Sequence, residues 1–287
     1  MVLDRLRLLV SHLTSPLTPN SPLPGLSFHV GPTSKPLKHV TLQQLLSEQV
    51  ALNGDCEALV SAWQGIRWTY RELDGLSDQL AKKFYGLGIR RGDRMGIMAG
   101  NCAEYVLTFF ASAKIGATLA VINPAYGPEE LEFALKTVGT SLLFSSVFRL
   151  TSSGTKVFIT TPKLNARSHI PLVEHLVPSL TLSSPSPVLP SLTHIIIIDN
   201  GDGIPNELSN FLPFTQIPAF EVDLSQLQSD LDEHDVINLQ FTSGTTGSPK
   251  AAMLTHQYLP QPFLYVASFF SLLSLTWAAT SLTTASS

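Results

Sequence analysis

A run of hydroxyl-bearing residues and glycines between residues 242 and 250 has the composition of an anion-binding loop. It reads Thr-Ser-Gly-Thr-Thr-Gly-Ser-Pro-Lys from Thr242 to Lys250. Glycine lets backbone N–H groups turn toward a ligand, hydroxyl groups donate further hydrogen bonds, and the lysine ammonium supplies positive charge. This combination of groups suits a polyphosphate.

The spacing of this loop excludes the Walker A type of phosphate loop. A Walker A loop places a glycine directly before its lysine and continues into a helix. Here Pro249 precedes Lys250, and residues 251–254 are apolar and typical of a strand. Residues 235–242 form a second β-rich run on the other side, so the loop is expected to connect two strands. An ordinary hairpin turn rich in Gly, Ser and Thr is the alternative interpretation.

The pattern S/T-S-G-T-T-G-x-P-K resembles the AMP-binding signature of the adenylate-forming superfamily, which includes acyl-CoA synthetases, firefly luciferase and the adenylation domains of peptide synthetases. The resemblance implies that the loop holds the β- and γ-phosphates of ATP while a carboxylate attacks the α-phosphate. It assigns no catalytic and no metal-ligating residue in this chain. The residues that it assigns to ATP binding are Thr242, Ser243, Gly244, Thr245, Thr246, Gly247 and Lys250.

Weaker motifs extend the resemblance over residues 40–256. Residues 70–73 (Tyr-Arg-Glu-Leu), 86–94 and 121–126 (Val-Ile-Asn-Pro-Ala-Tyr) look like the first half of acyl-CoA synthetases, and residues 235–241 look like the medium-chain fatty acyl branch. The implied activity is that of an ATP-dependent fatty acid–CoA ligase that forms an acyl-adenylate and uses Mg and coenzyme A. These upstream motifs are equally consistent with ordinary strand, turn and capping sequence.

The order of predicted elements favours an α/β fold with a mostly parallel sheet and flanking helices. The resemblance implies that this fold is the incomplete N-terminal domain of an adenylate-forming enzyme. Capping boxes at Thr41 and Thr69 predict two helix starts, and Pro128 predicts a third. Residues 58–63 and 66–70 are expected to pair as a hairpin, 103–116 to form an apolar helix, and 224–231 a short one. Strands are predicted over residues 94–99, 117–122 and 140–145. Such alternation is typical of parallel sheets.

The periodic pattern weakens from residue 146 onward. A Ser/Pro-rich segment near 178–193 is predicted to be a surface loop rather than part of the core. Residues 194–199 (His-Ile-Ile-Ile-Ile-Asp) are expected to form a strand buried on both faces. His256 has no partner that the sequence reveals, and a structural role is favoured for it.

Composition excludes several classes of protein. The chain has 287 residues, 14% charged and 44% hydrophobic, with net charge -4, which argues against disorder and against nucleic-acid binding. Cys56 and Cys102 lack metal-ligand spacing and are predicted to be buried free thiols.

Residues 1–39 form a leader that weakly resembles a mitochondrial transit peptide, although an exposed cytoplasmic leader fits as well. An intracellular location is expected.

The last segment, residues 257–287, contains no Asp, Glu, Lys or Arg and does not resemble the superfamily. The superfamily's Y-G-x-T-E segment, ribose-binding aspartate and C-terminal lysine are not found, so the chain is expected to be a truncated and inactive member. A non-catalytic nucleotide-binding remnant is the alternative. The tail is interpreted as intron-derived or frameshifted sequence. A membrane span, which would make the chain a membrane-anchored remnant, is less favoured. The reason is that serines and threonines dilute the apolar run of the tail.

Overall fold

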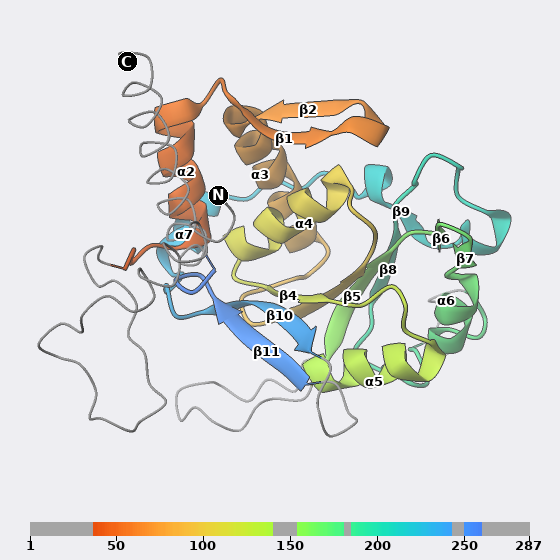
Figure 1. Ribbon diagram of the computed structural model, residues 1–287. Helices are drawn as coiled ribbons and strands as arrows, with labels where there is room; N and C mark the ends of the chain where they lie inside the picture. Colours follow the sequence, from red (N-terminus) through yellow and green to blue (C-terminus); the bar gives the residue numbers. More distant parts are fainter. Residues whose placement is uncertain (1–36, 140–153, 181–184, 243–249, 260–287) are drawn as a thin grey trace, which may run out of the picture. The chain divides into compact units, whose positions relative to one another are not determined.

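Seven strands form one mixed sheet in the computed structural model, which describes residues 37–139, 154–180, 185–242 and 250–259 (Figure 1). The strand order is β11-β10-β4-β3-β5-β8-β9. All neighbouring pairs are parallel except β10 and β11, which are antiparallel. The strands are β3 (Arg94–Met98), β4 (Thr118–Val121), β5 (Thr155–Thr160), β8 (His194–Ile197), β9 (Leu212–Pro213), β10 (Val236–Thr242) and β11 (Lys250–Thr255).

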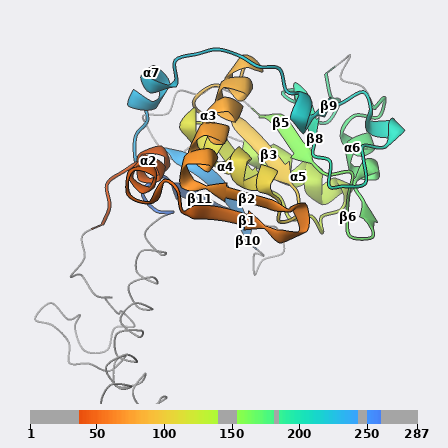
Figure 2. The same ribbon diagram turned by 90° about the horizontal axis from the view of Figure 1, so that it is seen from above.

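Helices cover both faces of this sheet, so the predicted α/β class is confirmed. On one face α3 and α4 pack over a core that includes Phe84, Met95 and Ile97. On the other face α5 and α6 enclose a second core around Leu135 and Phe158. Figures 1 and 2 show α3 and α4 on one side of the sheet and α5 on the other. The helices are α2 (Leu42–Asn53), α3 (Tyr70–Gly86), α4 (Ala103–Lys114), α5 (Pro128–Gly139), α6 (Ile170–Leu176) and α7 (Leu224–Ser229).

The predicted helix starts are confirmed by their hydrogen bonds. Thr41 and Gln44 form a complete capping box at α2, and Thr69 and Glu72 form one at α3. Each box pairs backbone N–H groups that the first helical turn would otherwise leave unsatisfied. The N–H and hydroxyl groups of Thr69 also lower the pKa of the Glu72 carboxyl group. Local sequence therefore sets where these two helices begin.

Two small antiparallel hairpins lie outside the main sheet. The first pairs β1 (Glu57–Ser61) with β2 (Ile66–Thr69), as predicted. Its turn contains a short 3-10 helix (Ala62–Gln64) and ends at Gly65, whose φ of 66° is readily adopted only by glycine. The second pairs β6 (Lys163–Leu164) with β7 (Arg167–Ser168) directly after β5. No sequence pattern predicted this second hairpin.

The isoleucine run of β8 is buried on both faces, which confirms the sequence prediction. Ile196 and Ile198 belong to the core beneath α3 and α4, whereas Ile195 and Ile197 belong to the core beneath α5 and α6. Burying one such side chain contributes about 1.5–3 kcal/mol of transfer free energy. The strand therefore joins the two cores across the middle of the fold.

The middle of the chain contains two elements that were not predicted and differs from its prediction in one respect. The weak pattern after residue 146 contains β5, which lies between β3 and β8 in the sheet, and also α6. In the described part of the Ser/Pro-rich segment, residues 185–193 form a loop, but Ser186 and Leu189 are buried, so the prediction that the segment lies outside the core was wrong for these two residues. The Ser186 hydroxyl donates to the Leu176 carbonyl and accepts from the Leu189 N–H. The strand predicted over residues 140–145 lies outside the described residues.

The two cysteines differ in their surroundings. Cys102 is buried, as predicted, and burial raises the pKa of its thiol to about 12. Cys56 is exposed, so the prediction that both thiols are buried was wrong for this residue. It lies in the turn between α2 and β1, where the chain passes over the surface.

None of the helices in the described ranges has the length and apolar content that a bilayer crossing requires. Most of the uncharged segment 257–287 lies outside those ranges, so the membrane interpretation of the tail stays a prediction. Residues 1–38 group as a separate unit, of which only Leu37 and Lys38 are described. The boundaries drawn from the sequence at residues 39 and 256 likewise stay predictions.

Candidate functional site: the carboxyl edge of the sheet

The predicted phosphate loop begins and ends on two paired strands. Thr242 is the last residue of β10, Lys250 is the first residue of β11, and the two are partners in the antiparallel ladder. The Thr242 hydroxyl donates to the Lys250 carbonyl at 3.3 Å, which closes the base of the loop. The other residues assigned to ATP, Ser243, Gly244, Thr245, Thr246 and Gly247, lie outside the described residues.

The direction of β10 places this base at the carboxyl edge of the sheet. β10 runs parallel to β4, and β4, β3, β5 and β8 all run parallel to one another. The chain passes from β3 to β4 on one side and later to β5 on the other side of β3. In open α/β sheets, ligands bind outside the carboxyl ends of the strands, near such a reversal of strand order. The loop therefore starts from the edge at which this fold class binds ligands.

The loop after β4 packs against the base of the phosphate loop. The ring of Tyr126 meets the ring of Phe241 edge-on, with centroids 6.3 Å apart and an interplanar angle of 75°. Such edge-to-face pairs are favourable beyond the apolar area that they bury. Burial and the nearby Glu130 carboxylate raise the pKa of the Tyr126 hydroxyl. Because Phe241 directly precedes Thr242, this contact joins two loops at the carboxyl edge.

A buried histidine anchors the far end of β11. The Nδ1 atom of His256 accepts a hydrogen bond from the Leu42 N–H at 3.0 Å, at the start of α2. The side chain is fully buried, and burial lowers its pKa to about 4. The imidazole is therefore neutral at physiological pH and carries its proton on Nε2. The sequence could not show this partner, because Leu42 lies 214 residues earlier.

Comparison with known protein families shows to which family the chain belongs. A family model described as "AMP-binding enzyme" matches residues 46–284 of the chain. The chain belongs to the AMP-binding enzyme family.

Relatives of known type agree with this family assignment. The acyl-CoA ligase sidI of Aspergillus fumigatus is 37% identical over 275 residues, which is 94% of this chain and 42% of that protein. The human medium-chain acyl-CoA ligase ACSF2, mitochondrial, is 36% identical over 83% of this chain and 37% of its own length. The chain thus spans about two fifths of the length of these relatives.

A solved structure has a similar fold. The anthranilate CoA ligase AuaEII, solved in complex with anthranoyl-AMP, matches 78% of this chain and 36% of its own chain, with a TM-score of 0.56 and 24% sequence identity. This likeness confirms that the sheet and its helices have the architecture of the first part of an adenylate-forming enzyme.

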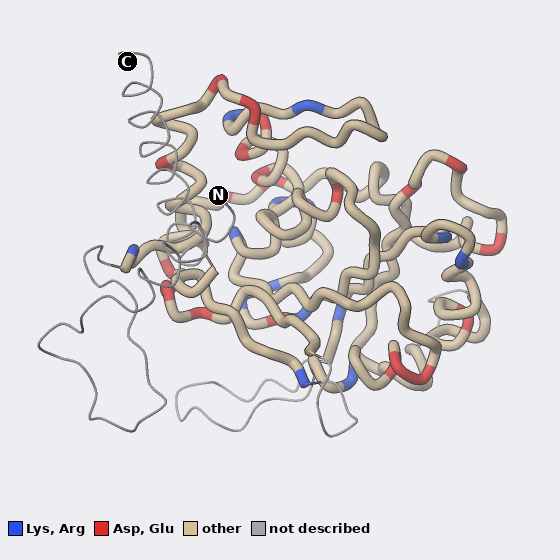
Figure 3. Tube along the Cα trace, viewed as in Figure 1, with Lys and Arg blue, Asp and Glu red and all other residues tan. Residues whose placement is uncertain are grey.

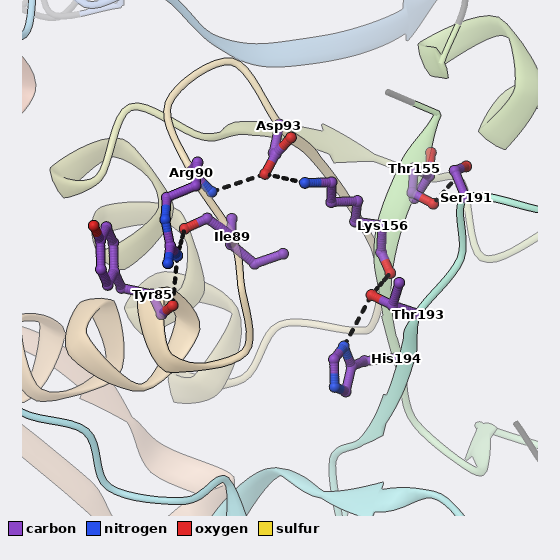
Figure 4. A network of polar contacts seen from close by, with 9 residues as sticks. All are labelled: Tyr85, Ile89, Arg90, Asp93, Thr155, Lys156, Ser191, Thr193 and His194. Atoms are coloured by element: carbon purple, nitrogen blue, oxygen red, sulfur yellow. Dashed lines mark hydrogen bonds and ion pairs between the residues drawn. The ribbon is translucent and has the colours of Figure 1, made fainter. Parts of the chain in front are cut away.

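A prominent polar network in this member of the AMP-binding enzyme family lies at the opposite, amino edge of the sheet (Figure 4). Asp93, just before β3, accepts from the Lys156 ammonium at 2.6 Å and from the Arg90 N–H at 2.8 Å. The Arg90 guanidinium also lies 3.6 Å from the centroid of the Tyr85 ring. On the other side of β5, the Thr193 hydroxyl donates to the Lys156 carbonyl at 3.1 Å. These contacts fix the starts of the strands and are remote from the AMP-binding signature.

The described charges fit a local anion site in the AMP-binding signature. Acidic and basic positions are interspersed along the described backbone (Figure 3). Lys250 is exposed, and among the described residues no ion pair of its ammonium is found. Within the same ranges no group of three or more His, Cys, Asp or Glu residues could hold a metal ion. Thr242 and Lys250, the two predicted phosphate-binding residues that the structure describes, bring a hydroxyl group and a positive charge to the base of the loop, and their role in binding phosphate stays a prediction.

Sequence reasoning found the signature but missed the residues that support it. Phe241 belongs to the motif at residues 235–241 and Tyr126 to the motif at residues 121–126, but nothing in either motif predicted their ring contact. Arg167, which binds the loop of Tyr126, lies in the segment of weak pattern and was not singled out. Only the strand order of the sheet brings these three residues together.

Proposed function

We propose that this chain is the nucleotide-binding part of an ATP-dependent ligase that joins a fatty acid to coenzyme A through an acyl-adenylate. One observation carries the proposal: the AMP-binding signature connects β10 and β11 at the carboxyl edge of the parallel sheet. The relatives described above, which are acyl-CoA ligases from a fungus and a vertebrate, support this class of reaction. Fatty acid and coenzyme A are proposed as its partners, together with magnesium carried by the nucleotide.

In this proposal the residues Thr242 to Lys250 hold the phosphates of ATP. Lys250 places one positive charge at the base of the loop, beside the Thr242 hydroxyl. Bound ATP supplies the α-phosphorus that the carboxylate substrate attacks, with pyrophosphate as the leaving group. Phosphoryl and nucleotidyl transfer depend mainly on positioning and charge stabilisation, so the role of these residues is to fix the phosphates and neutralise their charge.

Substitution of Lys250 tests the proposal directly. We expect the purified chain to bind MgATP in isothermal titration calorimetry. Lys250→Met should weaken binding about 10- to 100-fold, because a hydrogen bond to a charged group contributes about 1.5–3 kcal/mol. Lys83→Met, in the last turn of α3, is the matched control and should leave the affinity unchanged. Lack of ATP binding by the parent chain, or equal binding by Lys250→Met, would refute the proposal.

ATP–pyrophosphate exchange separates a ligase from a nucleotide-binding protein without catalysis. Exchange that depends on added medium-chain fatty acid would show that these residues carry out the first half of the reaction. Binding without exchange would assign nucleotide binding alone to this chain and refute catalysis by it.

A further inference from the structure

The β6–β7 hairpin carries an arginine that reaches the loop after β4. Arg167 lies in β7, and its guanidinium donates from Nη1 to the Ala125 carbonyl and from Nη2, at 2.6 Å, to the Tyr126 carbonyl. A guanidinium presents its N–H groups as a rigid planar fork, so it holds two consecutive carbonyl groups in one geometry. A lysine, with one flexible ammonium group, cannot reproduce that geometry.

The loop after β4 depends on this fork because its own hydrogen bonds use its N–H groups. The Asn123 side chain accepts from the Ala125 N–H at 2.9 Å, and the Asn123 carbonyl accepts from the Tyr126 N–H at 3.0 Å. The Glu130 carboxylate accepts from the Gly127 N–H at 2.7 Å. The carbonyl groups of Ala125 and Tyr126 are left to bind the guanidinium. Arg167 therefore completes the bonding of a loop that contains no regular structure.

Residues that precede and follow Arg167 in the sequence fix the position of its hairpin. The β6–β7 ladder pairs it with Leu164, and Asn165 between the strands adopts a φ of 52°. Two residues beyond Arg167, His169 is fully buried with its Nδ1 atom 3.0 Å from the Thr161 carbonyl. Because a carbonyl can only accept, Nδ1 carries the proton and donates. The β6–β7 hairpin is thus fixed to the end of β5 and places Arg167 beside the loop after β4.

We propose that Arg167 is a positioning residue of the ATP site. It fixes the backbone of Tyr126, whose ring contacts Phe241, and Phe241 precedes the Thr242–Lys250 pair at the base of the phosphate loop. The contact chain runs from β7 through the loop after β4 to β10, across the carboxyl edge. This inference rests on the proposed function, because it assigns a role in binding the same nucleotide.

The experiment compares Arg167→Lys with Arg67→Lys in the full chain. Arg67 is also an exposed arginine in a short hairpin, where it pairs with Glu57, and serves as the matched control. Arg167→Lys should bind MgATP about three- to tenfold more weakly, the range expected for residues that act on a site without touching its ligand. The unfolding midpoint of the unliganded protein should change no more than in the control, which separates positioning from a general loss of stability.

Hydrogen exchange of the unliganded chain provides a readout that does not depend on ATP. Arg167→Lys should speed exchange in peptides covering residues 123–130 and 236–242, and leave residues 57–69 unchanged. Phe241→Leu, which removes the ring contact but keeps an apolar side chain, should also weaken ATP binding. The double variant should lose little more affinity than either single variant, because both substitutions break the same contact chain.

The outcomes are distinguishable. Parent-like ATP affinity together with parent-like exchange in Arg167→Lys would overturn the inference and leave the proposed function intact. A parent chain that binds no ATP would refute the proposed function and, with it, the role of Arg167 in nucleotide binding. If Arg167→Lys does not fold, the ATP affinity of Phe241→Leu decides, and an affinity equal to that of the parent overturns the inference.

Discussion

The ammonium group of Lys114 is buried, with its side chain 1% exposed, between two carboxylates of α3. It lies 2.6 Å from Asp74 Oδ1 and 2.6 Å from Asp78 Oδ1, and it donates to the Asp74 carbonyl at 2.9 Å. Asp74 and Asp78 are one helical turn apart, so their like charges face the same partner. The lysine ends α4 and thereby ties the two helices of this face together.

We expect Lys114→Met to destabilise the fold by about 1–3 kcal/mol, below the loss for a fully buried ion pair, because the carboxylates of Asp74 and Asp78 would lose their counter-charge but are partly exposed to water. Urea unfolding followed by circular dichroism measures this loss. Lys136→Met is the matched control: its ion pair with Glu132 lies on the surface of α5, and its loss should cost about 0.5 kcal/mol or less. Equal effects of the two substitutions would contradict the structural role of Lys114.

At the scale of elements, close contact between β3 and α5 depends on Gly96. A Cβ atom at this position would lie 2.7 Å from Leu135 Cδ2, whereas a Cβ at Gly75 in α3 would meet nothing within 4 Å. β3 can therefore lie this close to α5 only because residue 96 has no side chain. Gly75 has no such constraint and only lowers the stability of its helix.

Alanine at these two glycines should change stability in opposite directions. Gly96→Ala should cost about 1–3 kcal/mol by overpacking the core, measured as a shift in the urea midpoint. Gly75→Ala should add about 0.5–1 kcal/mol, since alanine loses less backbone entropy in a helix. If Gly96→Ala were neutral, Leu135 would have to move freely within a fully buried core.

Elements with strong local signals were predictable from the sequence, and the structure shows why the others were not. Thr41 and Thr69 begin helices through hydrogen bonds to residues three positions away, so the sequence contains all the information. In contrast, β5 is a central strand whose pattern the sequence hides, because Thr155 and Thr160 are buried polar residues. Their hydroxyls bond to the carbonyls of Leu135 and Met98 on neighbouring elements, which only the folded sheet provides.

Part of the candidate site was likewise predictable from the sequence, and part of it was not. The signature around Thr242 and Lys250 is a local pattern with its own chemistry, and it was found without the fold. Its support is not local: Tyr126 and Arg167 lie 41 residues apart and meet because strand order brings their loops to one edge. Spacing along the chain therefore predicted the groups that bind phosphate, but not the groups that position them.

At the scale of the molecule, the stability of the fold should depend on histidines whose pKa values are lowered by burial or partial burial. Burial lowers the pKa values of His256, His169 and His194, that of His256 to about 4. For His256 the nearby Asp235 opposes the shift and Arg91 adds to it, but burial is the larger cause. The unfolded chain exposes all three imidazoles and restores an ordinary pKa of about 6.5. The unfolded state therefore binds more protons between these pKa values than the folded state does.

The sign of the pH dependence follows from this difference in proton binding. Stability from neutral His256 is complete above pH 6.5 and is lost as the pH falls toward 4. Between pH 7 and pH 5 the loss from this residue alone should reach about 2 kcal/mol. Urea unfolding at a series of pH values measures this loss of stability.

His256→Gln, whose side-chain oxygen can still accept from the Leu42 N–H, should flatten the pH curve, whereas His234→Gln at an exposed position should not. A parent chain with equal stability at pH 7 and pH 5 would show that His256 is protonated in the folded protein, and that its hydrogen bond to α2 is not formed as described.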